Sequence, residues 1–272
     1  MERQEKEKLE NIAKQIRKNI VTAIYYAKSG HPGGSLSIAD ILAVLYFKEM
    51  KVDPKNPAWE DRDRFVLSKG HCAPALYSAL SIKGYFPQED LISLRSLTSY
   101  LQGHPDMTKV PGVDMTTGSL GQGLSAANGM AIAAKMDKKD YRVYAILGDG
   151  EIEEGQIWEA AMSSSKYKLD NLCAILDYNH LQIDGTIEEV KGLINIFEKW
   201  RAFGFEVIEI DGHNIEEIVN AFQKARMVKG KPTILIAHTI KGKGVSYMEN
   251  KVEWHGKAPT EEQFKQAMKE LE

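Results

Sequence analysis

The sequence is poor in cysteine and lacks any long apolar segment. Its two cysteines, Cys72 and Cys173, lie far apart and form no CxxC pair, so neither a disulfide framework nor a zinc site is indicated. No stretch approaches the roughly 20 apolar residues of a membrane-spanning helix. The charged start MERQEKEKLE is not followed by the apolar core of a signal peptide. We therefore expect a soluble cytoplasmic protein with reduced thiols and no membrane partner.

The net charge is also small, at −3, and the basic residues are spread along the chain. This distribution gives no electrostatic reason to expect a nucleic-acid partner. With 272 residues, of which 43% are hydrophobic and 27% charged, the chain can bury a large core. We expect one α/β domain over residues 1–272, without an internal linker.

The stretch from 141 to 185 carries the pattern around which the rest is organised. Val143 to Leu147 is an apolar, β-favouring run that stops at Gly-Asp-Gly, and a helical stretch then leads to a second such run, Leu172 to Leu176. This order predicts a βαβ unit with two parallel strands. Because a right-handed crossover puts both strand ends at one edge of the sheet, Asp149 and Asn179 are expected to meet there.

These two side chains suit a particular kind of ligand. The Asp149 carboxylate and the Asn179 amide oxygen are hard donors that favour Mg²⁺, and so few protein ligands fit a metal that also takes oxygens from a phosphorylated ligand. Gly148 and Gly150 let the backbone approach a phosphate at the start of the following helix. Gly-Asp-Gly alone is most simply a turn. The second oxygen donor at the matching strand end favours a site.

The segments GDGEIEEG and DYNHLQIDG resemble the thiamine diphosphate signature of transketolases. That resemblance implies that Asp149, the side chain of Asn179 and the backbone carbonyl of Leu181 hold Mg²⁺, with Ca²⁺ or Mn²⁺ as possible substitutes. It also implies that Gly150 touches the diphosphate of the cofactor. Tyr178 stands where transketolases usually carry an Asp, one position before the metal ligand.

The start of the chain resembles the same family. Apolar residues at helical spacing predict an amphipathic helix from Leu9 to Ala27, ended by Lys28-Ser29-Gly30. His31 follows, and we expect it on a loop kept open by Pro32-Gly33-Gly34. A lone loop histidine is most often a surface residue. The segment SGHPGGSLSIADILAVLYF, however, resembles the transketolase N-terminus, including a helix from about Ile38 to Met50.

Two further histidines stand in similar surroundings. A strand over Arg64–Ser68 leads through RFVLSKGHCAPALY into a helix over Ala73–Ile82, and the resemblance puts His71 against the cofactor diphosphate. A helix from Pro87 to about Leu97 comes before His104. The glycine-rich segment TTGSLGQG then resembles the family's TTGPLGQG. It leads into a helix of small residues, and we expect the small-residue face of that helix to pack in the core whatever the role of the loop. By resemblance His104 faces substrate, and the cofactor is lined by Gly118, Ser119 and Leu120.

The rest of the chain alternates further strands and helices. Strands are predicted over 205–210 and 232–240, and helices over 197–203, over 215–228 with Asn214 as cap, and over 261–272. The tail segment WHG resembles the one that supplies another cofactor-facing histidine, His255. Together the elements predict a three-layer α/β/α fold with a mainly parallel central sheet, the thiamine diphosphate-binding fold.

Four histidines that lie beside glycine at element ends form the predicted site: His31, His71, His104 and His255. The other three, His180, His213 and His238, are expected to be structural. Imidazoles near an anionic cofactor can donate, accept and move protons near neutral pH. The resemblance implies that His31, His104 and His255 orient substrate hydroxyls and move protons, that His71 steadies the diphosphate, and that Glu154 lies at an interface beside the cofactor.

The implied protein is the N-terminal subunit of a split transketolase, which transfers a two-carbon ketol unit between sugar phosphates of the pentose phosphate pathway. Its partner is a C-terminal subunit whose pyrimidine-binding and C-terminal domains supply the glutamate and the aromatic surface for the aminopyrimidine ring. Two copies of each chain are expected, and the isolated chain is expected to self-associate. The alternatives are a related ketol-transferring synthase, such as deoxyxylulose-phosphate synthase, and a non-catalytic thiamine diphosphate-binding or regulatory subunit.

Overall fold

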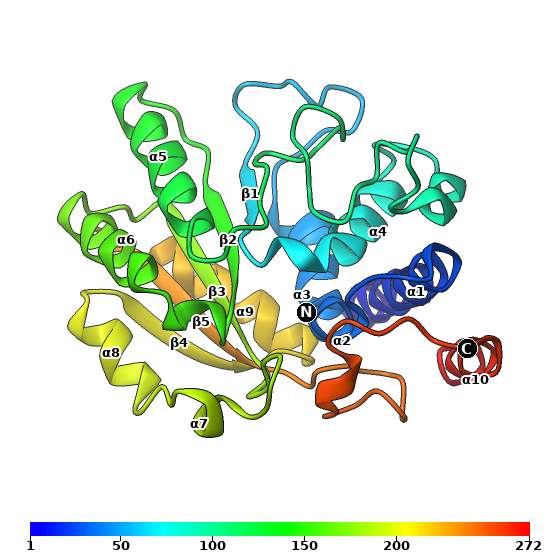
Figure 1. The fold of residues 1–272 in the computed structure, drawn as a ribbon. Coiled ribbons are helices and arrows are strands. Elements are labelled where there is room, and N and C mark those ends of the chain that lie inside the picture. The colour runs from blue at the N-terminus through cyan, green and yellow to red at the C-terminus, as the bar shows by residue number, and fades with distance from the viewer.

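The structure, a computed structural model, describes residues 1–272 and is built on one sheet of five parallel strands (Figure 1). In chain order the strands are β1 (Arg64–Leu67), β2 (Val143–Gly148), β3 (Leu172–Tyr178), β4 (Glu206–Asp211) and β5 (Thr233–His238). Their order across the sheet is β1-β2-β3-β5-β4, and every neighbouring pair is parallel. The predicted parallel α/β fold is therefore confirmed.

Helices cover both faces of this sheet, which is why the inner strands β2, β3 and β5 are buried and mostly apolar, whereas the edge strand β4 carries charged, partly exposed residues. Val143, Ala145 and Leu147 of β2 join one buried cluster, whereas Tyr144 and Ile146 join the other. The first face carries α5 (Gly123–Met136), α6 (Gly155–Lys166) and α8 (Ile196–Ala202). The second carries α1 (Arg3–Ala27), α3 (Ala39–Val44), α4 (Ala73–Lys83) and α9 (Ile215–Met227), with α10 (Glu261–Glu270) packed on α1 (Figure 1).

The central βαβ unit forms as predicted. Strand β2 pairs with β3 in a register that sets Gly148 opposite Asp177, so both strands end at the same edge. Asp149 follows β2 directly, and the backbone N–H of Asn179 donates to its carboxylate at 2.9 Å. The two residues that are 30 positions apart in sequence therefore touch in the fold. The prediction of a single domain over 1–272 stays a prediction.

The segment around His31 differs from the sequence expectation. Helix α2 (Pro32–Ser37) begins directly after His31, whereas α3 runs directly into a π-helical turn over Leu45–Glu49, and the two together match the helix expected from about 38 to 50. Pro32 suits the first turn of a helix because its missing N–H is not needed there. Gly33 is buried, and a Cβ on it would lie 2.9 Å from the Trp254 carbonyl oxygen. The two glycines therefore allow close packing inside a helix and do not keep a loop open.

The helix expected from 87 to 97 is also shorter than predicted. It is a 3-10 turn over Gln88–Ser93. Arg95, with a φ of 62°, has a left-handed backbone that ends any continuation of a right-handed helix. The Ser93 hydroxyl accordingly bonds the Asp90 carbonyl at 2.7 Å, a local contact that competes with regular helix.

The next two features concern the cysteine thiols and the length and polarity of the helices. Cys72 and Cys173 are both buried free thiols, and burial raises the pKa of Cys173 to about 12. None of the helices combines the length and the apolar character that crossing a membrane requires.

Candidate active site

A cavity of about 370 Å³ opens at the carboxyl ends of the strands. Eleven of the predicted site residues line it: His31, His71, His104, Gly118, Leu120, Asp149, Gly150, Glu154, Asn179, Leu181 and His255. Ser119 does not, because its side chain is exposed outside the cavity. The structure thus brings the segments around 31, 71, 104, 149, 179 and 255 to one place, and the roles given to these residues stay predictions.

Asp149 is a buried carboxylate with no cation bonded to it. Only 3% of the residue is exposed, and its oxygens accept backbone N–H groups from Gly150 at 2.9 Å, Asn179 at 2.9 Å and His180 at 2.7 Å. Burial, and next the charge of Asp177, raise its pKa to about 7. A positive charge beside Asp149 would relieve this cost of burial.

Two neutral oxygens complete the predicted ligand set. The Asn179 side-chain oxygen accepts from the Leu181 N–H at 3.2 Å, and the Leu181 carbonyl accepts from the Lys241 ammonium at 3.0 Å. No group of three or more His, Cys, Asp or Glu side chains is placed to hold a metal ion. One carboxylate with two neutral oxygens fits Mg²⁺, which usually takes its remaining ligands from water and phosphate. The residues present therefore fit a metal that is shared with a diphosphate.

Beneath this edge lies a buried ion pair that the sequence analysis missed. The Lys69 ammonium donates to Asp177 at 2.6 Å and to the Gly34 carbonyl at 2.7 Å, and the two side chains are 2% and 0% exposed. Burial opposes both charges, but their mutual attraction outweighs it, so the pKa of Lys69 is raised and that of Asp177 is lowered. Asp177 also accepts from Ser37 at 2.7 Å and from the Asn179 amide at 3.1 Å. The pair thus orients one of the predicted metal ligands.

Replacing Lys69 with Met is expected to lower the free energy of unfolding by about 3–5 kcal/mol, because it leaves Asp177 buried without its counter-charge. Urea unfolding of the chain at pH 7 measures this loss. Lys265→Met is the matched control, since Lys265 pairs with Glu261 on the exposed surface and its loss should cost within about 0.5 kcal/mol. A cost for Lys69→Met as small as that of the control would contradict this role.

The glycine-rich loop before α5 is held by a second buried acid. Glu151 is 2% exposed and accepts the Gly121 N–H at 3.0 Å, the Gly148 N–H at 2.9 Å and the Ser68 hydroxyl. Gly121 has a φ of 86°, which a residue with a side chain rarely adopts. Glu151 therefore ties this loop to the ends of β1 and β2, a structural role that the sequence analysis did not foresee.

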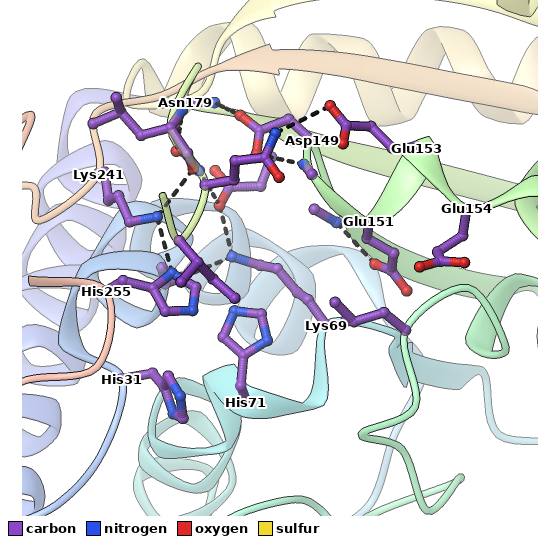
Figure 2. A pocket seen from close by; sticks show the side chains of 18 of the residues that line it. His31, Lys69, His71, Asp149, Glu151, Glu153, Glu154, Asn179, Lys241 and His255 are labelled. Carbon is purple, nitrogen blue, oxygen red and sulfur yellow. Dashed lines mark hydrogen bonds and ion pairs between the residues drawn. The ribbon is translucent and has the colours of Figure 1, made fainter. Parts of the chain in front are cut away.

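Three of the predicted histidines form a cluster at the cavity wall (Figure 2). The ring centroids of His31, His71 and His255 lie 5.1–5.4 Å from one another. His104 is more exposed and lies beside Gly118, where an added Cβ would approach its ring to 3.0 Å. All four rings come from different segments, so the cluster exists only in the folded chain.

The clustered rings are neutral at pH 7. Burial, followed by the charge of Arg95, lowers the pKa of His31 to about 4, and burial, followed by the charge of Lys241, lowers that of His255 to about 3. Burial and the charge of Lys69 likewise hold the pKa of His71 well below its usual value. Neutral imidazoles can each donate one hydrogen bond and accept another. The sequence alone left open whether these rings are neutral or cationic, and the lowered pKa values indicate the neutral form.

Lys241 is a further cavity residue that the sequence analysis missed. Its ammonium donates to the Leu181 carbonyl and lies 3.1 Å from Nδ1 of His255 (Figure 2). An ammonium has no lone pair, so the ring nitrogen is the acceptor. Lys241 lies three residues after the end of β5. This position near a strand end was the one feature of the sequence that could have identified it as a site residue.

The three histidines expected to be structural lie outside the cavity. His213 bonds Asp40 through Nδ1 at 2.7 Å and accepts the Ile240 N–H through Nε2 at 2.9 Å. His238 bonds Glu209 at 2.7 Å. The ring of His180 is 46% exposed and lies 3.8 Å from Glu188.

The sequence matches the profile of the transketolase thiamine diphosphate binding domain over residues 8–272. It is 53% identical over 264 residues to 6-deoxy-6-sulfo-D-fructose transketolase subunit SqwG of Clostridium sp., in an alignment that covers 97% of this chain and 96% of that protein. It is 49% identical over 265 residues to one of the named subunits of the apulose-4-phosphate transketolase of Phocaeicola vulgatus, with 97% of this chain and 94% of that protein covered.

A transketolase from Leishmania mexicana has the same fold. Its structure superimposes with a TM-score of 0.92 at 34% identity, over 97% of this chain and 41% of that one. The chain therefore spans about two fifths of this longer protein, but nearly the whole length of the two related subunits.

Proposed function

We propose that this chain, which belongs to the transketolase family, is the cofactor-binding subunit of an enzyme that transfers a two-carbon ketol unit from a ketose to an aldose. The observation that carries the proposal is the single cavity in which Asp149 and Asn179 meet four histidines. An oxygen-donor edge beside several neutral imidazoles suits an anionic cofactor and a hydroxylated substrate.

Thiamine diphosphate would supply a nucleophilic carbon and a sink for the electron pair released when the carbon–carbon bond breaks. The chain's own residues would bind and position it. Gly150 and Gly118 leave room for close approach of the diphosphate, and Lys241 and His71 face the same space. The neutral rings of His31, His104 and His255 would bind substrate oxygens, and a free ring nitrogen among them could take up and return a proton.

The metal proposed for this site is Mg²⁺, with Ca²⁺ or Mn²⁺ as substitutes. Asp149 would contribute the one negative charge, and Asn179 and the Leu181 carbonyl would contribute neutral oxygens. Lys241 already donates to that carbonyl, so the metal and the ammonium would share it, or the ammonium would turn to the diphosphate. Support comes from the buried, uncompensated state of the Asp149 carboxylate.

Asp149→Ala is expected to weaken Mg²⁺-dependent binding of thiamine diphosphate by the assembled enzyme by more than about 100-fold. Loss of residues that only support metal ligands typically costs about 10- to 100-fold, and a direct ligand should cost more. Calorimetric titration of the cofactor with and without Mg²⁺ measures the effect. Asp137→Ala is the matched control, because it removes one exposed carboxylate outside the cavity. Unchanged affinity in folded Asp149→Ala would defeat the assignment.

The proposed partner is a C-terminal subunit that carries the pyrimidine-binding and C-terminal domains, in an assembly of two copies of each chain in the cytoplasm. The names of the two similar proteins, both of which are called subunits, support the existence of a partner subunit. Those names also mention a sulfosugar and a sugar phosphate, so the proposed substrates are ketoses and aldoses with an anionic end group. Ketol transfer by the co-expressed pair, across a panel that includes sulfonates and pentose phosphates, tests the proposal.

A non-catalytic cofactor-binding subunit is the alternative from another class. A binder needs the diphosphate site but not the histidines, since proton-transfer groups add nothing to holding a diphosphate. The four rings that line the cavity favour the enzyme. Cofactor binding without ketol transfer on any member of the panel would favour the alternative.

A further inference from the structure

Arg95 lies behind the histidine cluster and outside the cavity lining. It follows the 3-10 turn over Gln88–Ser93, and its backbone N–H donates to the Leu101 carbonyl at 2.8 Å. Its φ of 62° is unusual for a residue with a long side chain. This backbone conformation directs the half-buried guanidinium toward the segment that carries His31.

The guanidinium joins two histidine-bearing segments. One nitrogen, Nη1, donates to the Ser29 hydroxyl at 2.8 Å, and Nη2 lies 3.3 Å from Nδ1 of His31. On its other side it packs on Gly103, where an added Cβ would lie 2.9–3.0 Å from the guanidinium atoms. Gly103 is the residue before His104. Arg95 therefore contacts both the His31 segment and the His104 segment.

A guanidinium in a protein has five N–H donors and no acceptor. Nδ1 of His31 must therefore accept the hydrogen bond through its lone pair, and it cannot carry a proton in this geometry. We propose that Arg95 is a positioning residue that fixes His31 as the neutral tautomer with its proton on Nε2. Arg95 acts through His31, since it does not line the cavity itself.

Nε2 is the ring nitrogen of His31 that Arg95 leaves free. The Nε2 edge of His31 faces Gly256, 3.7 Å from a Cβ built there, and the ring lies edge-on to His255. His31 lines the cavity, and with Nδ1 engaged by Arg95 it can offer a substrate oxygen only the Nε2 N–H and has no free nitrogen to accept a proton. This step rests on the proposed function. Among the predicted substrate-facing rings, His104 has no ring hydrogen bond in the structure and is left to carry protons.

The surroundings of His31 favour the neutral ring as well. The charged and titratable groups facing it are Arg95, Lys241, His71, His104 and His255. None of its ring hydrogen bonds goes to a carboxylate that would stabilise an imidazolium. Burial and Arg95 lower its pKa to about 4, so the ring stays neutral above that pH. Without Arg95 the pKa should rise toward the usual value, and the ring should begin to charge at higher pH.

Long-range proton–nitrogen NMR of the full chain, labelled with ¹⁵N-histidine, distinguishes the two neutral tautomers and the imidazolium. The His31 signals are assigned by their loss in His31→Asn. At pH 7 we expect an unprotonated Nδ1 and a protonated Nε2. A protonated Nδ1, or an imidazolium, would overturn the proposal even if no Arg95 variant folds. The measurement needs neither cofactor nor partner, so its outcome is separate from that of the proposed function.

Variants then test the cause. In Arg95→Met we expect a mixture of tautomers and a His31 pKa raised from about 4 toward 6.5. Arg95→Lys keeps a cationic donor and should restore the Nε2–H form. Ser29→Ala removes the other hydrogen bond of the guanidinium and should leave the tautomer unchanged. An unaltered tautomer and pKa in folded Arg95→Met would show that Arg95 does not hold the ring.

Discussion

Without its partner subunit, the chain is expected to show no ketol transfer, a loss of all measurable activity. The composition of the cavity gives the reason. Among its 21 lining residues only Leu120, Leu181 and Ile183 are hydrophobic, and none is Phe, Tyr or Trp. Such a surface suits a diphosphate and a metal, but it offers little for two aromatic rings, which bind best against apolar or aromatic side chains. We expect the proposed partner subunit to supply this apolar or aromatic surface.

The measurement compares the purified chain, the purified partner and their mixture in one ketol-transfer assay with thiamine diphosphate and Mg²⁺. Activity should appear only in the mixture and should saturate as the partner is titrated. The chain with Asp137→Ala, changed only at an exposed position outside the cavity, should behave as wild type in the same mixture. Robust transfer by the 272-residue chain, with no second polypeptide detected by mass spectrometry, would contradict the proposed division of labour.

His104→Ala is expected to lower the turnover of the assembled enzyme by about 10²- to 10⁴-fold, the usual contribution of a general acid–base group. His104 lies at the cavity and its ring makes no hydrogen bond, so both nitrogens are available to substrate. None of the hydrogen bonds of the Asp149 carboxylate involves His104. Cofactor affinity should therefore stay close to that of the wild type.

Steady-state kinetics give the turnover, and calorimetry gives the cofactor affinity. His238→Ala is the matched control, since His238 lies outside the cavity and bonds only Glu209. A His104→Ala enzyme with near-wild-type turnover would show that this segment is structural. Equal losses of turnover and cofactor affinity would place His104 at the cofactor and not at the substrate.

The sequence was sufficient for the parts of the site that depend on strand ends. Periodicity located β2 and β3, and the rule that parallel strands end at one edge predicted that Asp149 and Asn179 meet. The four histidines were found from a local signal, a glycine beside each. That signal marks a tight turn, but it says nothing about which turns converge, so their roles rested on family resemblance.

The residues that the sequence analysis missed act through contacts between distant segments. Lys69 and Asp177 are 108 positions apart, and nothing near either residue predicts a buried pair. Arg95 reaches Ser29 and His31 only because its backbone turns left-handed, where propensity predicted a continuing helix. Pro32 and its glycines were interpreted as loop residues because the packing of Trp254 and Lys241 against them is set by the tertiary fold.

The most direct test of the central claim is the rate of two-carbon transfer by the cofactor-depleted assembly before and after thiamine diphosphate is added. We expect no transfer by the depleted assembly, full recovery with thiamine diphosphate and Mg²⁺, and no recovery when the chain carries Asp149→Ala. Transfer that proceeds without the cofactor, or recovers equally with Asp149→Ala, would contradict the account.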